Sequence, residues 1–465
     1  MRWKRVTAFA LLIAAAAGAW WMSRPKYAPV PAEIACIVGI YRLDDGRLVD
    51  LAPLTNATAL RWRLIDGRSG RLIRDADGRW QQRAGWGDAA DATPIEPGSC
   101  ASPGLRFEGQ HGQRLTFVEQ DTRFTGIGES LAGKLVLPPG DGPVPVAVLV
   151  HGSEAWSAIR HGYFQRLLPA HGIGVFVYDK RGTGASSGRY SQDFDLLAGD
   201  AAAALKEARR LAGARAGRVG FAGASQGGWI APLAARHSDP AFIAVSYGLA
   251  DSPLAEDRDQ VVLDLTRKGH GADALAKARE VTDATGAIMA SHFRDGYARL
   301  AELKARYGHE PWWQDMHGEF TGDLVRWPAF ALRWFGPFYD EGTSWTYDPM
   351  PALQTLQPPL LWILAGADRE APPEETRRRL LSVAGRGNVT LVEFPDTDHG
   401  IIEFVQQPDG SRTGTRIAEG YLPLLIDWIR DGRLGPGPYG HARILAPGVP
   451  APPAPDDAAV TKQVL

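Results

Sequence analysis

The sequence has little cysteine and no excess of basic charge, and each shortage excludes a class of protein. Two cysteines in 465 residues are too few for a cysteine-rich zinc site or a disulfide-dense scaffold. Lysine and arginine number 51 against 53 aspartates and glutamates, so we expect no nucleic-acid partner. With 45% hydrophobic residues, the chain is able to bury a large core and is long enough for more than one domain.

The N-terminal residues have the features of an export signal. Three basic residues among the first five precede an apolar run over residues 6–19, which ends in the small-x-small sequence Ala17-Gly18-Ala19. If the next three residues are counted, the run is also long enough for a single membrane anchor. A buried N-terminal helix is a third interpretation. We expect residues 1–22 to be a signal peptide or membrane anchor, which places the rest of the chain in the periplasm or outside the cell.

Residues 34–108 predict a small module of antiparallel β-hairpins. Three Asp-Gly pairs occur in it, at residues 45–46, 66–67 and 77–78. Asp-Gly supplies the positive φ angles that tight hairpin turns require. Cys36 lies near the start of the module and Cys100 near its end, so we expect a disulfide that closes it, as an exported chain allows. Two buried free thiols are the alternative.

From residue 113 to residue 433, apolar segments alternate with helix-like segments. Runs typical of strands buried on both faces occur at residues 144–150, 174–178, 219–222, 242–247, 360–364 and 389–394. Such alternation predicts a doubly wound, mostly parallel α/β sheet. The Pro-, Gly- and Ala-rich residues 434–465 are expected to form a flexible tail.

The interval over residues 250–350 breaks this alternation and predicts a helical cap inserted over a crevice at the strand ends. Five tryptophans crowd its second half: Trp312, Trp313, Trp327, Trp334 and Trp345. Most of them would serve as the core of the cap itself. We expect some of these rings to face the crevice and bind an apolar acyl or alcohol group. No obvious residue supplies a fixed charge for an ionic substrate.

The strongest local signal is a Gly-x-Ser-x-Gly motif at residues 223–227, between a predicted strand and a predicted helix. This context is typical of a nucleophile elbow, in which Ser225 would present its hydroxyl from a strained turn. Gly223 and Gly227 would let the neighbouring strand and helix approach closely. The sequence therefore predicts Ser225 as a nucleophile.

Backbone N–H groups beside this serine are expected to form an oxyanion hole. One is the N–H of Gln226, at the start of the predicted helix. The other is the N–H of Ser153, in the loop after the run at residues 144–150. His151 lies in the same loop, and we interpret it as a loop-shaping histidine rather than a catalytic base.

A serine hydroxyl needs a base, and the base needs an orienting carboxylate. Among the eleven histidines, His399 alone follows the last strand and precedes the last helix of the predicted domain. Asp368 ends an earlier buried strand, which places it at the same sheet edge. Two alternatives stay open for the acid: Asp368 could cap the helix that begins just after it, and Asp251 could be the acid instead.

The order of these motifs resembles that of α/β-hydrolases, and more narrowly of bacterial exported esterases of the serine-aminopeptidase-like group. Two further motifs carry the resemblance, His151-Gly152-Ser153 and the Tyr-Asp-Lys-Arg-Gly-Thr-Gly-Ala-Ser stretch at residues 178–186. The resemblance covers residues 113–433 and implies a catalytic triad of Ser225, Asp368 and His399. The His-Gly-Gly-Gly run of another esterase branch is missing, which argues against large esters of tertiary alcohols.

We therefore expect a serine hydrolase that cleaves small apolar carboxylic esters through an acyl-enzyme. A serine peptidase or a thioesterase using the same triad is the alternative, followed by a non-catalytic binding protein. A peptidase that reads a free N-terminus would need acidic cap residues that face Ser225. We expect no metal and no cofactor, because the sequence contains no His-Glu-x-x-His pattern, P-loop or Gly-x-Gly-x-x-Gly run.

Overall fold

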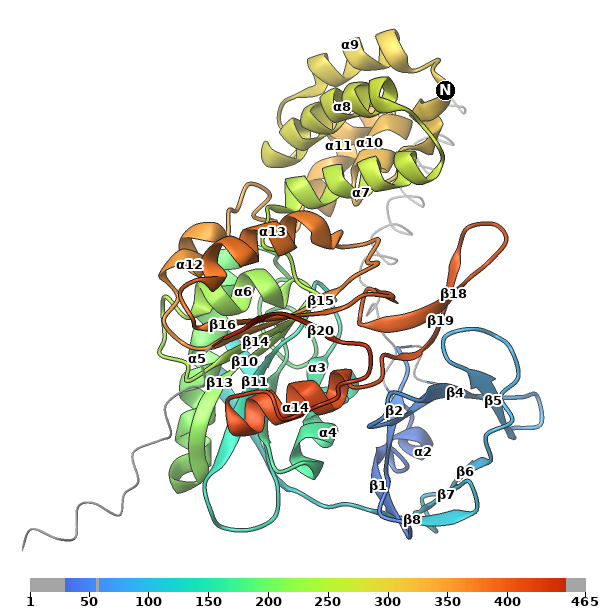
Figure 1. Cartoon of the computed structure of the whole chain (residues 1–465), viewed down its shortest axis with the longest axis vertical. Coiled ribbons are helices and arrows are strands. Elements are labelled where there is room, and N and C mark those ends of the chain that lie inside the picture. Colours follow the sequence, from blue (N-terminus) through green and yellow to red (C-terminus); the bar gives the residue numbers. More distant parts are fainter. Residues whose placement is uncertain (1–29, 56–57, 449–465) are drawn as a thin grey trace, which may run out of the picture.

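The computed structural model describes residues 30–55 and 58–448, and it contains an N-terminal β module, a central α/β domain and a helical cap (Figure 1). The predicted signal peptide or anchor at residues 1–22 lies outside the described residues. Within the described ranges, no helix is long and apolar enough to cross a membrane.

The N-terminal module is one antiparallel sheet, as the Asp-Gly pairs predicted. Its strands are β1 (Gly39–Leu43), β2 (Leu48–Pro53), β3 (Leu60–Leu64), β4 (Ser69–Arg74), β5 (Trp80–Ala84), β6 (Ile95–Pro97), β7 (Leu105–Phe107) and β8 (Gln110–Arg114). They are ordered β5-β4-β3-β2-β1-β8-β7-β6. The three Asp-Gly pairs form the β1–β2, β3–β4 and β4–β5 turns, and all three glycines have positive φ. Because β8 pairs with β1, the sheet extends past the expected boundary at residue 108.

The expected disulfide is present in the module. Cys36 follows the short helix α2 (Ala32–Ala35), and Cys100 lies in the loop between β6 and β7. Their Cα atoms are 5.4 Å apart, and the bridge closes a loop with a sequence separation of 64 residues. Neither cysteine is buried, so the alternative of two buried free thiols is wrong.

The central sheet has the mostly parallel, doubly wound architecture that the sequence predicted. Its strands are β9 (Val118–Thr125), β10 (Ser130–Leu137), β11 (Val144–Val150), β12 (Gly174–Tyr178), β13 (Ala216–Ala224), β14 (Ile243–Ser246), β15 (Leu360–Ala365), β16 (Val389–Phe394) and β20 (Arg443–Pro447). The order is β20-β16-β15-β14-β13-β11-β12-β10-β9, with β11 to β16 parallel. The two sheet edges, β9–β10 and β20, pair antiparallel with their neighbours.

Helices cover both faces of this sheet, which explains why its central strands are apolar throughout. One face packs against α5 (Phe194–Ala212), α6 (Gly227–Ala234), α12 (Met350–Thr355) and α13 (Pro373–Ala384). The other packs against α3 (Ala158–His161), α4 (Phe164–Ala170) and α14 (Tyr421–Asp431). Ile40 and Leu48 of the module join the second cluster, so the module and the domain share a core.

Two features of the C-terminal part depart from the sequence interpretation. The expected flexible tail begins with an ordered segment, because β20 within it adds an edge strand to β16; residues 449–465 lie outside the described part. Between β16 and α14 the chain also forms a small sheet of β17 (Thr397–Asp398), β18 (Ile402–Gln406) and β19 (Arg412–Ile417). This hairpin reaches the module, where the N–H of Ile417 donates to the carbonyl of Gly67 and the N–H of Trp86 to that of Gly414.

The cap lies between β14 and β15 and stands above the carboxyl ends of the parallel strands (Figure 1). It consists of α7 (Pro253–Arg267), α8 (Ala272–Ala290), α9 (Tyr297–Tyr307), the 3-10 turn η2 (Pro311–Asp315), α10 (Thr321–Arg326) and α11 (Ala329–Tyr339). Its core is formed by apolar side chains of α7 to α10, together with Trp312 and Trp313.

Candidate active site

Ser225 occupies the turn between β13 and α6, as the Gly-x-Ser-x-Gly motif predicted. Its φ angle is +51°, a left-handed conformation that a residue with a Cβ adopts only under strain. Its N–H donates to the carbonyl of Ser246, and its own carbonyl accepts from the N–H of Gly228. These bonds hold the turn, and the serine remains partly exposed.

The two glycines of the motif are required by close packing around this turn. A Cβ on Gly227 would lie 2.2 Å from the carbonyl oxygen of Val150, and a Cβ on Gly223 would lie 2.6 Å from that of Gly227. Side chains at either position would push β11, β13 and α6 apart. The structure therefore places Gly223 and Gly227 where the sequence argument put them.

The structure brings His399 and Asp368 together. Nδ1 of His399 lies 2.8 Å from Oδ2 of Asp368, which is buried in the loop after β15. The other oxygen of Asp368 accepts the N–H groups of Glu370 and Ala371 at 2.9 and 2.8 Å. Asp368 therefore fixes the loop ahead of α13 while its second oxygen orients the imidazole. It does not cap the helix, because the N-cap position of α13 is Pro372.

The alternative acid, Asp251, has other partners. Its carboxylate lies 3.0 Å from a guanidinium nitrogen of Arg379 on α13 and accepts the N–H of Ser252. The geometry therefore favours Asp368 as the residue that orients His399.

The loop after β11 carries Ser153 to the same pocket as Ser225 and Gln226. Two residues fix this loop: Nζ of Lys180 donates to the carbonyl of Gly152 at 2.6 Å, and the hydroxyl of Tyr190 donates to that of Ser153. Burial, the main cause, lowers the pKa of Lys180 to about 8. These positions were not assigned a role from the sequence, although Lys180 belongs to the stretch that carried the resemblance.

His151 does not face this pocket. Its ring stacks on Trp156 at 5.5 Å, and burial, the largest influence, lowers its pKa. It lines a second cavity of about 300 Å³, between the sheet, α4 and the module. His151 is therefore not among the residues that line the cavity of Ser225.

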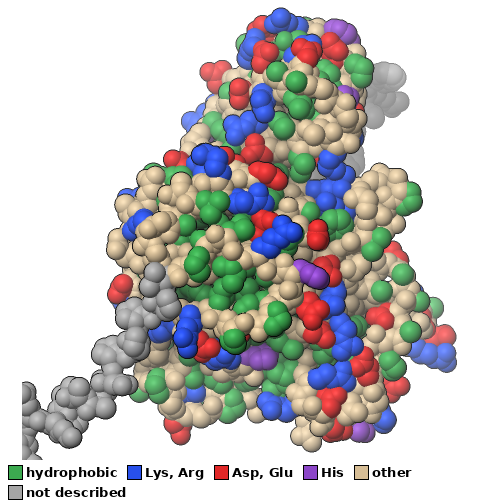
Figure 2. Space-filling model, in the orientation of Figure 1, with side chains coloured by type: hydrophobic (Ala, Val, Ile, Leu, Met, Phe, Trp, Pro, Cys, Tyr) green, Lys and Arg blue, Asp and Glu red, His purple; other side chains and the backbone are tan. Residues whose placement is uncertain are grey.

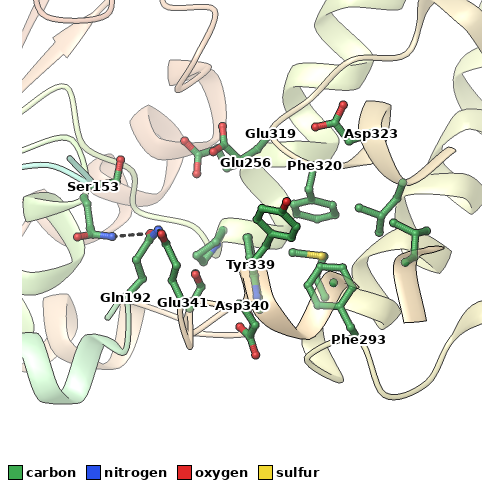
Figure 3. Close-up of a pocket in the computed structure, with 18 of the residues that line it drawn as sticks. Ser153, Gln192, Glu256, Phe293, Glu319, Phe320, Asp323, Tyr339, Asp340 and Glu341 are labelled. Carbon is green, nitrogen blue, oxygen red and sulfur yellow. Dashed lines mark hydrogen bonds between the residues drawn. The ribbon is translucent and has the colours of Figure 1, made fainter. Parts of the chain in front are cut away.

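Ser225, Ser153 and Gln226 open into a cavity of about 640 Å³ between the central domain and the cap (Figure 3). Aromatic side chains of the cap line much of it: Phe293, Phe320, Trp327, Phe335, Tyr339 and Trp345. Of the five tryptophans considered from the sequence, Trp327 and Trp345 reach the cavity. Trp312 and Trp313 belong to the core of the cap, and Trp334 is exposed.

Acidic side chains also line this cavity, which the sequence did not reveal. Glu256 comes from α7, Glu319 from the segment before α10, and Glu370 from the loop after β15. Figure 3 shows the carboxylates of Glu256 and Glu319 close together. Burial raises the pKa of Glu256 and Glu319, and the charge of Glu370 raises both further. Partial burial and the charge of Asp368 raise the pKa of Glu370, whereas His399 lowers it. Among the residues that the structure describes, the lining includes no lysine, arginine or histidine.

Glu370 also lies beside the predicted base. Its Oε1 is 3.5 Å from Nε2 of His399, the ring nitrogen that does not bond Asp368. Burial lowers the pKa of His399, but the hydrogen bond to Asp368 and the charges of Asp368, Glu370 and Asp398 together raise it to about 9. Among the described residues, the ring of His399 bonds Asp368 and not Ser225. A hydrogen bond between a catalytic base and its nucleophile often forms only when substrate is bound.

The described residues contain no cluster of three or more side chains suited to a metal ion. Asp315 in the cap forms ion pairs, because its carboxylate contacts both Lys268 and His270.

Comparison with known proteins identifies the family. A sequence profile described as the alpha/beta hydrolase family matches residues 147–410, more than half of the chain. Among solved structures, an acylaminoacyl peptidase from Pyrococcus horikoshii aligns with a TM-score of 0.41 and 16% identity, over 82% of this chain and 55% of the peptidase. This chain thus spans just over half the length of that enzyme.

Two esterases align over a smaller share of this chain. One from Pyrococcus furiosus has a TM-score of 0.40 and 15% identity, and it covers 61% of this chain and 84% of its own. One from Pyrobaculum calidifontis has a TM-score of 0.37 and 18% identity, and the alignment covers 61% of this chain and 77% of the esterase.

Proposed function

Because the chain belongs to the alpha/beta hydrolase family, we propose that it is a serine hydrolase that cleaves carboxylic esters through an acyl-enzyme. The observation that carries the proposal is the strained turn at Ser225, which presents the residue to a cavity lined by aromatic and acidic side chains. The pairing of His399 with Asp368 after the neighbouring strands supports it. No metal or cofactor is required for this chemistry.

In the proposed mechanism, Ser225 attacks the carbonyl carbon of the ester while Nε2 of His399 accepts the serine proton. The same proton then passes to the leaving alcohol, and a water molecule repeats both steps to release the acid. Asp368 keeps Nδ1 protonated and stabilises the imidazolium that forms. His399 must be neutral at the start, and its Nε2 must exchange the carboxylate of Glu370 for the hydroxyl of Ser225.

The N–H groups of Ser153 and Gln226 are the proposed oxyanion donors. Both residues line the cavity beside Ser225, and Gln226 is the N-cap of α6, next to the N–H groups that have no partner within the helix. The side-chain amide of Gln226 donates to Gln192 at 2.9 Å, which fixes it against the wall of the cavity (Figure 3). Lys180 fixes the opposite loop, so both donors stand on supported backbone.

The aromatic lining of the cavity supports a neutral, apolar ester of short to medium chain as the substrate. Rings of Phe320, Trp327 and Phe335 offer surface for an acyl or alcohol group, and esters have better leaving groups than amides.

The acidic residues of the cavity favour a second candidate, a hydrolase of aminoacyl substrates. Glu256 and Glu319 are cap residues on the wall of the cavity that contains Ser225, which is the arrangement a serine peptidase needs to read a free N-terminus. The repulsion that Glu319 exerts on Glu256 would be relieved by an ammonium group. His399 already acts on Glu319, where its charge lowers the pKa of the carboxyl.

Labelling with a fluorophosphonate probe tests the shared step. We expect the wild type and Ser382→Ala, a serine on the exposed surface of α13, to be labelled, and Ser225→Ala to be neither labelled nor active. A turnover within about tenfold of the wild type in Ser225→Ala would exclude this nucleophile, because loss of a triad member costs far more.

A substrate panel then separates the two candidates. It compares kcat/KM for p-nitrophenyl esters, thioesters, and aminoacyl or prolyl p-nitroanilides. Faster cleavage of a neutral ester than of every anilide supports the esterase. Faster cleavage of an anilide than of every ester makes the protein a peptidase. In that case the double variant Glu256→Gln, Glu319→Gln should lower kcat/KM for anilides with a free amine more than for the same anilides with an N-acetyl group.

We also propose that the protein acts outside the cytoplasm. The Cys36–Cys100 disulfide is compatible with an oxidising compartment. Fractionation of cells that express the full chain, with N-terminal sequencing of the product, distinguishes cleavage near Ala19 from an uncleaved anchor; recovery in the cytoplasm would contradict export.

A further inference from the structure

Helix α11 of the cap exposes an unusual amount of aromatic surface. The exposed fractions are 57% for Trp327, just before the helix, and 59 to 74% for five rings within it: Phe330, Trp334, Phe335, Phe338 and Tyr339. We call these six residues the α11 aromatic face. A soluble surface seldom leaves so many neighbouring large rings in water, so the face marks an interaction site.

The spacing of these residues divides the face into two parallel stripes. Phe330, Trp334 and Phe338 are four residues apart and follow one side of the helix, and Phe335 and Tyr339 follow the adjacent side. The buried side is narrow: it consists of Ala331 and Gly336, and a Cβ on Gly336 would lie 2.2 Å from the ring of Phe293. The helix therefore packs on the cap through small residues and directs its large ones outward.

The composition of the face fits a lipid surface. Tryptophan, tyrosine and phenylalanine are the residues that insert at the boundary between headgroups and acyl chains. Two exposed arginines, Arg326 before the face and Arg333 within the helix, provide charges that anionic headgroups attract. By contrast, the outer end of the cap at α8 and α9 carries acidic and basic side chains of both signs (Figure 2).

The face also continues into the cavity described above. Trp327, Phe335 and Tyr339 line that cavity and at the same time belong to the α11 aromatic face. An apolar molecule dissolved in a bilayer in contact with the face would meet a continuous aromatic path toward Ser225. The sequence gives a reason to expect the protein near a membrane, because its apolar residues 6–19 predict passage through a membrane or anchoring in one.

We propose that the α11 aromatic face binds the surface of a lipid bilayer, with Phe330, Trp334 and Phe338 inserted at the headgroup boundary. This interaction is separate from the N-terminal segment, and it orients the mouth of the cavity toward the lipid. It does not depend on the identity of the substrate.

A fluorescent label that reports lipid contact at a single position tests the proposal. Because Cys36 and Cys100 are bonded to each other, an introduced cysteine is labelled selectively. We would attach an NBD group to Trp334→Cys and, as the control, to Lys206→Cys on the exposed side of α5. The full chain is reconstituted with vesicles of phosphatidylethanolamine and phosphatidylglycerol, with or without a nitroxide on the upper acyl chain.

We expect nitroxide lipids to quench the label at position 334 at least about three times as strongly as the label at position 206, because an inserted face lies within the headgroup boundary. Adding Phe330→Asp and Phe338→Asp to the labelled chain should abolish the difference, because carboxylates resist insertion. Equal quenching at the two positions would overturn the proposal even if the N-terminal segment tethers the protein. A label at 334 that is shielded from both aqueous iodide and nitroxide lipid would also overturn it, in favour of a second copy of the chain.

Discussion

Replacement of Glu370 by glutamine tests whether this carboxylate controls the protonation of His399, the proposed catalytic base. Its Oε1 lies 3.5 Å from Nε2 of His399, so its negative charge stabilises the imidazolium and raises the pKa of the ring. A base with a pKa of about 9 is only about 1% neutral at pH 7. Removal of the charge should lower this pKa and increase the neutral fraction.

The magnitude follows from the distance and the solvent exposure. The side chain of Glu370 is 58% exposed, so the dielectric constant of water is the appropriate limit. Two unit charges 3.5 Å apart then interact with about 1 kcal/mol, and salt reduces the value further. This energy corresponds to a decrease of about 0.5 to 1 unit in the pKa of His399, and to about three to ten times more neutral base at pH 7.

The assay is the pH dependence of kcat/KM for p-nitrophenyl butyrate between pH 5.5 and 10. The acid limb of the profile should move to lower pH in Glu370→Gln, while Glu374→Gln, an exposed change on α13, leaves it in place. An acid limb that stays within about 0.2 units of the wild type, or moves upward, would refute the electrostatic argument.

Three further changes probe the site and its supports. Asp368→Asn should lower kcat by about 10³-fold or more, whereas Asp251→Asn, whose carboxylate pairs with an arginine, should leave it within about threefold; the reverse order in steady-state assays would move the acid. Lys180→Met should lower kcat about tenfold with little change in KM, because the loop that carries Ser153, a proposed oxyanion donor, loses a charged hydrogen bond; an unchanged kcat would contradict this role. Replacing Cys36 and Cys100 together by serine should cost about 2 to 5 kcal/mol of unfolding free energy in urea titrations while activity at 25 °C persists; unchanged stability would show that the bridge contributes nothing.

The sequence by itself determined the parts of this protein that depend on local pattern. Runs of β-branched and apolar residues define β11, β12 and β16 because such runs suit strands covered on both faces. Asp-Gly pairs define the hairpin turns because glycine tolerates positive φ. The environment of Ser225 is local too, since the glycines that make its turn possible lie within two residues of it.

The tertiary structure decided whatever depends on residues that are distant in the chain. Asp368 and His399 meet because parallel strands end at the same sheet edge. Only the folded structure shows that Asp251 forms an ion pair with Arg379. The tail contributes β20 because β16 offers an unpaired edge, which its composition does not reveal. The carboxylates of Glu256, Glu319 and Glu370 come from three separate segments and share one cavity only after the cap folds over the sheet. The packing of the cap helices likewise decides which aromatic residues are buried. Trp312 lies in the core of the cap and Trp334 on its surface, although the sequence pattern does not distinguish the two positions.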